Sequence, residues 1–285
     1  MDTAEDVRGS DVPATNECAG IQPCGYLLEL SLDWIVLRAS ENIHHLLGES
    51  HVTLIDEPLG RFVHAQALHD LRNLFSRLIG TTGIARAYGV RPTDDHSVVD
   101  VAFQLSNGRV LLEAVPSAQS FGQCFGTVGG LIAGLANSTG QALLDGGARR
   151  MRALAGYDRV TLTCGDHRAE SSRGSFRAVA QSSADVPPIL ADIDAPEIAI
   201  FPRRSGDTSL AAALMRSPGR QASDRLRDEG VCASLRVPFS VDDLSGEFRC
   251  DSRKPRSPHF ELHAAAELFA QLFAMRLEID RFRRR

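Results

Sequence analysis

The sequence predicts an α+β protein made of two antiparallel-sheet modules. Apolar and polar residues alternate over residues 85–90, 98–104 and 110–114, and Asn107-Gly108 between the last two segments is a strong hairpin-turn signal. A second group of short strand-like segments follows beyond residue 156. Of the 285 residues, 43% are hydrophobic, so each module can bury a core of its own.

The first predicted module extends over residues 18–116. Before the alternating strands we predict two strands, at Gly25–Leu30 and Trp34–Arg38. A short helical stretch at Glu41–Leu47 and a longer helix at His64–Leu78 follow them. Residues 1–17 are polar and show no periodicity, so we expect a flexible N-terminal arm there.

Residues 117–141 are the predicted linker between the modules. No charged residue occurs from Ser117 to Leu144. The continuous apolar run, Val128 to Ala136, is much shorter than the roughly 20 apolar residues that a membrane-spanning helix needs. We therefore predict a buried linker helix and no membrane span.

The second predicted module extends over residues 142–257. A helical pattern over Ala142–Leu154 leads to Gly156-Tyr157-Asp158-Arg159-Val160, which begins a strand. Three further strands are predicted at Phe176–Ala180, Cys232–Phe239 and Gly246–Cys250.

Residues 258–285 form the last predicted helix. Its apolar residues recur every three or four positions, as in a coiled-coil seam, at Ala265, Leu268, Leu272, Met275, Ile279 and Phe282. Packing on the helix's own module is one use for this stripe. Because the stripe continues into a charged end, we expect its last five members to meet a second copy in a homodimer.

The net charge and the cysteine content indicate which partners and which cellular compartment to expect. The formal net charge of −5 and the pI near 6.0 supply no basic field for a phosphate backbone, so we expect no nucleic-acid partner. The six cysteines form no CxxC pair, and no charged segment followed by an apolar segment is found at the N-terminus. These features predict a reduced, cytoplasmic protein.

Several motifs carry a family resemblance. Ile21–Leu28 reads Ile-Gln-Pro-Cys-Gly-Tyr-Leu-Leu and resembles the Ile-Gln-Pro-His-Gly-x-Leu-Leu box that opens the PAS domain of bacterial phytochromes, the bilin-binding red-light sensors. Gly156–Val160 matches the entry of their GAF domain, and Phe260-Glu261-Leu262 belongs to a closing block at the family's spacing. The resemblance covers most of the chain from Cys18 to Leu277, and it implies a PAS-like first module and a GAF-like second module.

The resemblance also implies a figure-of-eight knot. In the family, the N-terminal arm passes through a lasso of the GAF domain. Asp192–Pro196 and Phe201-Pro202 resemble one side of that lasso, and Ile21 would be the residue inside the loop.

The resemblance further implies a bilin pocket, whose attachment thiol is altered here. The family's attachment cysteine falls near Ser10, and a hydroxyl is a much weaker nucleophile than a thiolate. Cys18 and Cys24 are the alternative thiols. Cys24 replaces the histidine of the box, and we favour a small core thiol over a pigment attachment for it.

The polar contacts of the pocket are altered as well. The segment with the family's propionate-binding arginine and tyrosine is missing before Asp192. Ala222 replaces a pocket histidine and Thr163 replaces a tyrosine, whereas a pair of histidines corresponds to Asp251-Ser252. The family's Asp-x-Pro pattern remains as Asp185-Val186-Pro187, in which the aspartate gives its backbone carbonyl to the pyrrole nitrogens. Since each lost charge-assisted hydrogen bond costs about 1.5 to 3 kcal/mol, we predict a degenerate pocket without a bound cofactor.

Two functional hypotheses follow. The first is a PAS-GAF sensory module of a bacterial signalling protein that has lost normal biliverdin binding and acts through dimerisation, a protein partner or a C-terminal output domain. The second is a biliverdin-binding red/far-red photoreceptor whose pigment is held noncovalently or through Cys18 or Cys24. We do not expect an enzyme, because no nucleophile–base set or metal-ligand spacing stands out.

Overall fold

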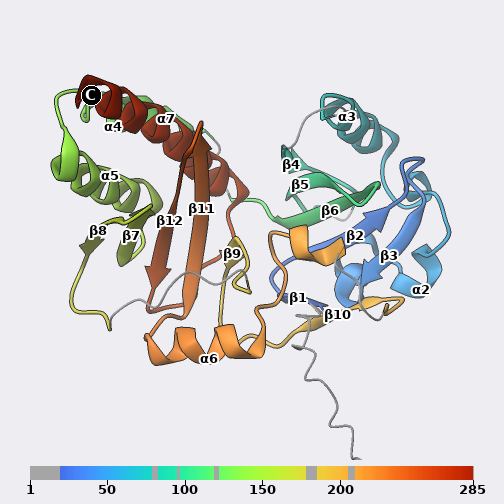
Figure 1. Ribbon diagram of the computed structural model, residues 1–285. Helices are drawn as coiled ribbons and strands as arrows, with labels where there is room; N and C mark the ends of the chain where they lie inside the picture. Colours follow the sequence, from blue (N-terminus) through green and yellow to red (C-terminus); the bar gives the residue numbers. More distant parts are fainter. Residues whose placement is uncertain are drawn as a thin grey trace, which may run out of the picture.

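The computed structural model describes residues 20–78, 83–94, 97–118, 122–177, 185–204 and 209–284 (Figure 1). Two antiparallel sheets with helices packed against them confirm the predicted α+β class. The predicted arm, residues 1–17, and Cys18 lie outside the described residues.

The first sheet has seven strands in the order β1-β10-β3-β2-β6-β5-β4. These strands are β1 (Gly20–Ile21), β2 (Tyr26–Leu30), β3 (Val36–Ser40), β4 (Ala85–Val90), β5 (Val99–Ser106), β6 (Arg109–Pro116) and β10 (Ile198–Phe201). The hairpin predicted from Asn107-Gly108 joins β5 to β6, and both residues have positive φ, 50° and 72°, as this tight turn requires.

Short helices cover one face of this sheet. They are α1 (His44–Leu47), α2 (His51–Leu54) and α3 (Ala65–Ser76), with 3-10 turns at Glu41–Ile43 and Leu59–Arg61. Helix α3 buries Ala67, Leu71 and Phe75, which are four residues apart and therefore share one helix face. The ring of Phe75 meets that of Trp34 edge to face, with 5.9 Å between centroids.

The second sheet has five strands in the order β8-β7-β12-β11-β9. These strands are β7 (Arg159–Cys164), β8 (His167–Ser172), β9 (Ile189–Leu190), β11 (Ala233–Val241) and β12 (Leu244–Ser252). Strand β8, which was not predicted, forms a hairpin with β7 through a turn at Gly165. The strand predicted next in the sequence was Phe176–Ala180. Phe176 and Arg177 are not in a strand, and residues 178–180 lie outside the described residues.

Three helices cover one face of the second sheet: α4 (Gln123–Ala133), α5 (Gly140–Ala155) and α7 (Phe260–Arg284) (Figure 1). Helix α6 (Arg220–Asp228) lies near the start of β11 and the end of β12, and a 3-10 turn at Ser209–Ala212 precedes it. The core between sheet and helices is aromatic. Phe248 of β12 lies 5.8 Å from Phe269 and 5.2 Å from Phe273 of α7, measured between ring centroids. Gly147 permits the close contact of α5 with α7, because a Cβ atom there would lie 2.4 Å from Phe273.

The linker differs from the single buried helix predicted for residues 117–141. Helix α4 ends at Ala133 and α5 begins at Gly140. Within α4 only Val128 is fully buried, because the helix packs against α7 and α5 along one face and leaves the other face to solvent. Among the described helices, none combines the length and the apolar character needed to span a membrane.

One strand of the first sheet comes from the part of the chain that was predicted to belong to the second module. β10 lies in the part of the chain that the sequence analysis assigned to the second module, yet it pairs with β1 and β3 in the first sheet. The segment from Ile198 to Phe201 therefore leaves the second module and completes the sheet of the first (Figure 1).

Candidate functional site

The segment Gly20–Gln22 is held on three sides by the second half of the chain. Ile21 pairs with Ile198 of β10 and forms an isolated bridge with Arg216 on its other side. The side-chain amide of Gln22 donates through Nε2 to the carbonyl of Ile189 (2.7 Å). Its Oε1 accepts from the backbone amide of Ala191, the residue after β9 (2.7 Å). Ile21 and Gln22 are buried, as the family's lasso would require. The knot itself stays a prediction, because the arm that would pass through the loop lies outside the described residues.

The face of the second sheet that points away from α4, α5 and α7 is polar. Strand alternation places Val160, Leu162 and Cys164 of β7 in the core under the helices and turns Arg159, Thr161 and Thr163 to the opposite face. The cross-strand partners of these three residues on β12 are Asp251, Arg249 and Glu247, respectively. Charged side chains therefore occupy the sheet face that carries the predicted pigment position Thr163.

Three of these charged groups, together with Glu229 at the end of α6, form a buried ion network. Arg159 donates through Nε (3.0 Å) and Nη2 (2.7 Å) to Asp251 Oδ2, and Arg249 Nε donates to Asp251 Oδ1 (2.9 Å). Arg249 Nη2 also donates to Glu229 Oε2 (2.5 Å), which lies 3.4 Å from Arg159 Nη2. The side chains of Arg159 and Asp251 are completely buried. Two guanidinium groups and two carboxylates balance in charge, so the network tolerates its burial.

The electrostatic effect of the network is visible at Arg249. Burial disfavours the charged guanidinium, but the adjacent Asp251 and Glu229 carboxylates outweigh this effect and raise the pKa of Arg249. Ser234 Oγ donates to Asp251 Oδ1 (3.1 Å) and adds a further partner for this carboxylate. Asp251, at the position of a family histidine, is thus an acceptor for three protein donors.

The backbone carbonyls of Asp185 and Val186 are also engaged by the protein. Arg216 donates to Asp185 O (3.0 Å) and to Val186 O (3.1 Å), and Arg236 donates to Val186 O (3.0 Å). Val186 and Ala222 lie in one small apolar cluster, formed by Val186, Leu190, Ile193, Ala222, Leu226 and Val231. The structure therefore brings the Asp-x-Pro segment and Ala222 together. The backbone carbonyls of Asp185 and Val186 accept hydrogen bonds from arginine side chains.

Two other predicted site residues lie apart from this cluster. Thr163 is exposed on β7, which is separated from β9 by β12 and β11. Cys24 is half-buried and packs against the core under α7. Burial, with a smaller contribution from Asp192, raises the pKa of the Cys24 thiol to about 11, so this cysteine stays protonated near neutral pH.

Helix α7 presents an apolar outer face. Phe269, Phe273 and Ala274 are completely buried against the sheet and the other helices. On the opposite side, the predicted dimer residues are exposed: Leu268 (43%), Met275 (56%), Ile279 (48%) and Phe282 (62%). Leu272 is half-buried and packs against the core. The described chain thus leaves most of the predicted seam uncovered.

Asp251 was expected at the site from the sequence, but most of its partners were not. Arg159 was seen only as part of a motif, and Glu229, Arg216 and Arg236 were not singled out for the site. The available signal was the run of charged residues at alternating positions of β12, Glu247, Arg249 and Asp251, with Phe248 and Cys250 between them. Their pairing across strands and with α6 depends on tertiary structure.

The comparisons with known proteins agree with this architecture. Residues 16–115 match the family model described as PAS fold. No curated protein matches the chain. The chromophore-binding domain of an unusual bacteriophytochrome from R. palustris has a TM-score of 0.75 at 22% identity, over 93% of this chain and 96% of that chain. The chromophore-binding domain of a Stigmatella aurantiaca phytochrome has a TM-score of 0.71 at 23% identity, over 90% and 95%.

A longer bacteriophytochrome structure from R. palustris matches with a TM-score of 0.77 at 20% identity, and this chain covers 60% of it. The chain therefore has the fold of a bacteriophytochrome chromophore-binding domain. This finding confirms, at the level of the fold, the resemblance that the sequence motifs carry.

Proposed function

We propose that this chain is a phytochrome-like sensory module that does not hold biliverdin in the manner of its structural relatives. It signals through the outer face of α7, by dimerisation or by contact with a protein partner or output domain. The fold shared with bacteriophytochrome chromophore-binding domains supports a sensory module. The absence of family-like pigment binding is inferred from the altered site.

The observation that carries the proposal is the engagement of the expected pigment contacts by arginines. The Asp185 carbonyl, which would accept from pyrrole nitrogens, accepts from Arg216. Asp251 is bound by Arg159 and Arg249. A pigment at these groups would have to displace charge-assisted hydrogen bonds and to leave buried charges without their partners, at a cost of several kcal/mol.

The test is to mix the purified chain with excess biliverdin and record its absorbance after gel filtration. We expect no pigment to travel with the protein and no light-induced change. A stable red-absorbing band that responds to light would contradict the proposal. A bacteriophytochrome chromophore-binding domain treated in parallel shows that the pigment and the procedure are competent.

The second candidate is a photoreceptor with unusual pigment attachment, which is favoured by the match to chromophore-binding domains over nearly the whole chain. Covalent attachment through Cys18 or Cys24 predicts zinc-enhanced fluorescence of the protein band on a denaturing gel. The burial that keeps the Cys24 thiol protonated argues against attack by this residue. Loss of the fluorescent signal in a Cys18→Ser or a Cys24→Ser variant would identify the attachment site.

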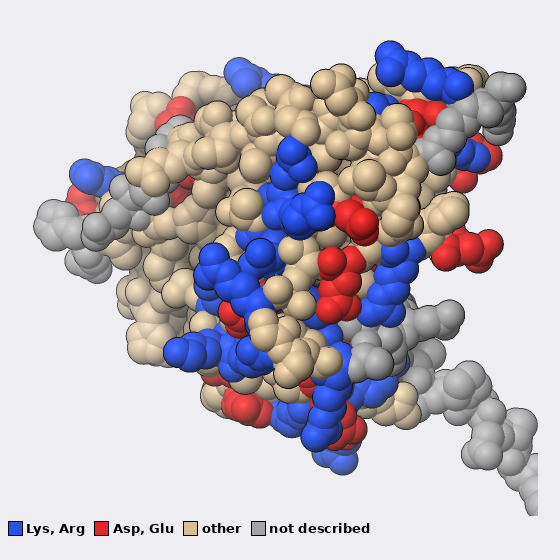
Figure 2. All heavy atoms as spheres, turned by 90° about the vertical axis from the view of Figure 1, so that its left-hand side faces the viewer, with Lys and Arg blue, Asp and Glu red and all other residues tan. Residues whose placement is uncertain are grey.

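The surface charge is compatible with a contact through α7. Figure 2 shows the left-hand side of Figure 1, and Lys and Arg side chains gather mainly in its middle and lower parts. A broad area without charged side chains lies above them, at the height of α4 and α7 in Figure 1. Interfaces are depleted of charge at their centre, so this part of the surface suits a helix partner, and we propose a second copy of this chain.

A further inference from the structure

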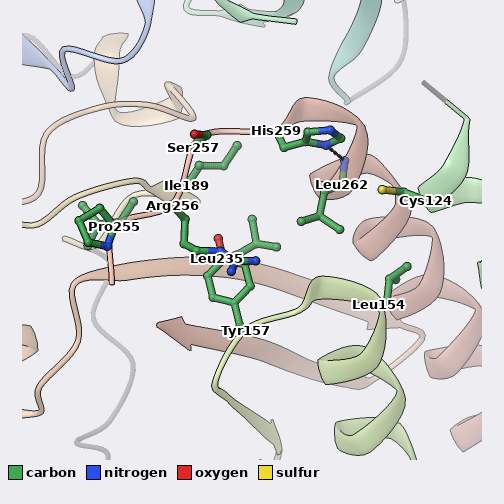
Figure 3. A pocket seen from close by; sticks show the side chains of 11 residues that line it. Cys124, Leu154, Tyr157, Ile189, Leu235, Pro255, Arg256, Ser257, His259 and Leu262 are labelled. Carbon is green, nitrogen blue, oxygen red and sulfur yellow. Dashed lines mark hydrogen bonds between the residues drawn. The ribbon is translucent and has the colours of Figure 1, made fainter. Parts of the chain in front are cut away.

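A cavity of about 420 Å³ opens where α4, the end of α5, the edge strand β9 and the segment leading into α7 meet (Figure 3). This volume is within the range of roughly 300 to 1,000 Å³ that is usual for small-molecule sites. Ile189 and Leu235, which are almost completely buried, line the cavity together with Leu154 and Leu262. Branched aliphatic side chains therefore supply most of its apolar wall.

The charged side chain in this lining is Arg256. Its guanidinium carbon lies 4.7 Å from the centroid of the Tyr157 ring, and Nη2 donates to the carbonyl of Ala155 (3.3 Å). These contacts hold the guanidinium in place, so little conformational freedom remains to be lost on binding a ligand. Among the described residues that line the cavity there is no aspartate or glutamate, so Arg256 gives this lining a positive charge.

The remaining polar groups of the lining are mainly donors. His259 Nδ1 accepts from the backbone amide of Leu262 (2.9 Å), which places the hydrogen of the neutral imidazole on Nε2. Burial, with a contribution from Glu261, raises the pKa of the Cys124 thiol, which therefore stays protonated. Ser257 adds a hydroxyl at the rim.

We propose that this cavity binds a small aliphatic carboxylate, with its carboxylate at Arg256 and its chain among the leucine and isoleucine side chains. In Figure 3, Arg256 and Leu154 lie on opposite sides of the cavity, so one end is cationic and the other apolar. A carboxylate matches the planar guanidinium, whereas a cationic ligand would be repelled by it. Arg256 covers the phenol ring of Tyr157 in the lining, so this ring offers no free face to a ligand and the wall favours an aliphatic chain over a stacked ring.

Binding at this place would stabilise contacts between distant parts of the chain. The carbonyl of Ile189 accepts from Gln22 of the N-terminal segment, whereas Cys124 and Leu262 belong to the first turns of α4 and α7, respectively. A ligand that contacts these elements in the folded state raises the melting temperature through linkage. The lining shares Leu190 with the cluster of Val186 and Ala222 but includes neither Asp185 nor Asp251, so octanoate binding and biliverdin binding are tested on different polar groups.

The test is calorimetric titration of the whole chain with octanoate, accompanied by melting curves. We expect saturable one-to-one binding and a higher melting temperature. Octanol should bind at least about ten-fold more weakly, because it cannot form the ion pair. Arg256→Gln should weaken octanoate binding by about ten- to a hundred-fold. The matched control is Arg253→Gln, since Arg253 also stacks on a ring, that of Phe176 at 4.1 Å, but lines no part of this cavity.

A second variant tests the cavity without removing its charge. Leu154→Trp fills the space and should abolish binding, whereas Leu268→Trp on the exposed face of α7 should leave it unchanged. Circular dichroism establishes that each variant is folded. The proposal is overturned if the folded chain shows no saturable binding, if octanol binds as tightly as octanoate, or if octanoate binds folded Leu154→Trp as it binds the natural chain. Equal octanoate affinity in folded Arg256→Gln also overturns it.

Discussion

At the scale of single residues, buried charges distinguish this chain. Arg159 and Asp251 are completely buried at the centre of the ion network, and Glu113 of β6 is buried between the modules. Each of these ionisable groups has a charged partner or backbone amides beside it. Because removing one partner leaves the other without compensation, these residues should be sensitive to substitutions that barely change side-chain size.

Asp251→Asn should lower the free energy of unfolding by about 3 to 5 kcal/mol, because Glu229 alone then faces Arg159 and Arg249. Urea denaturation followed by circular dichroism measures this change. Asp243→Asn is the matched control, since Asp243 is exposed and pairs with Arg281 at the surface. We expect no measurable loss for the control. Similar losses in both variants would show that the buried network has no special role.

Glu113 should make stability depend on pH. Burial raises its pKa to about 7, although the amides of Leu214 (2.8 Å) and Met215 (2.7 Å) donate to its carboxylate and act in the opposite direction. The folded chain thus binds more protons than the unfolded chain between the ordinary glutamate pKa, about 4.5, and about 7. The contribution of Glu113 to stability is full below this window and falls as the pH rises through it.

Subtracting the unfolding free energy of Glu113→Gln from that of the natural chain isolates this contribution from other titrating groups. We expect the difference to decrease by about 2 kcal/mol between pH 5 and pH 7. Denaturant titrations at several pH values provide the measurement. A difference that stays constant or increases with pH would show that the Glu113 carboxylate is already ionised throughout the window.

At the scale of elements, α7 organises the helical layer. Its carboxylates accept hydrogen bonds from the first residues of the other two helices: Glu261 from the amides of Gly122 (2.8 Å) and Cys124 (3.2 Å), and Asp280 from the amide of Gly140 (3.0 Å). These amides have no partner within their own helix, and a negative charge at a helix N-terminus is favourable. One helix thereby fixes where α4 and α5 begin.

Glu261→Gln should destabilise the chain by about 1 kcal/mol, because the neutral amide is a weaker acceptor for the N-terminus of α4. Hydrogen exchange followed by mass spectrometry should show the faster exchange mainly in α4, with the strands of both sheets unchanged. Glu278→Gln on the same helix is the control, since Glu278 pairs with Arg281 and caps no helix. Uniformly faster exchange over the whole chain would contradict a local capping role.

At the scale of the whole molecule, polar contacts join the first module to α7 and to the second sheet. Arg86 of β4 donates to His263 Nδ1 (2.7 Å) and pairs with Glu267 (2.8 Å), both on α7. His263 also forms a hydrogen bond with the backbone of Arg236 on β11. Burial, followed by the charge of Arg86, lowers the pKa of His263 to about 3, so the imidazole is neutral and can accept from Arg86. The helix with the proposed interface therefore contacts both sheets.

The proposed dimer predicts that Met275→Glu combined with Ile279→Glu shifts the chain from dimer to monomer. Charges placed in the centre of the apolar face have to be desolvated on association. Sedimentation equilibrium measures the molecular mass, and circular dichroism confirms that the monomer is folded. Val52→Glu is the control, because Val52 is also an exposed apolar residue (72%) but lies on α2. A natural chain that is monomeric at high concentration would refute the interface.

Local patterns predicted most elements but few of the contacts at the candidate site. The Asn107-Gly108 turn and the spacing of Ala67, Leu71 and Phe75 depend on neighbours along the chain, so the hairpin and α3 could be found from sequence. The linker was misjudged, because the absence of charge does not reveal that α4 has only one covered face. Predicted contacts such as that of Ala222 with the Asp-x-Pro segment came from the family resemblance.

The sequence by itself determined the α+β class, the position of most strands and helices, and the resemblance to the bacteriophytochrome fold, because these features are encoded in short-range periodicity and contiguous motifs. Only the tertiary structure decided that β10 completes the first sheet, that Arg159 and Arg249 bind Asp251, and that Arg216 binds the Asp185 carbonyl. These contacts join residues far apart in the chain, and any of the many arginines was a possible partner. Burial and geometry select among them after the chain has folded.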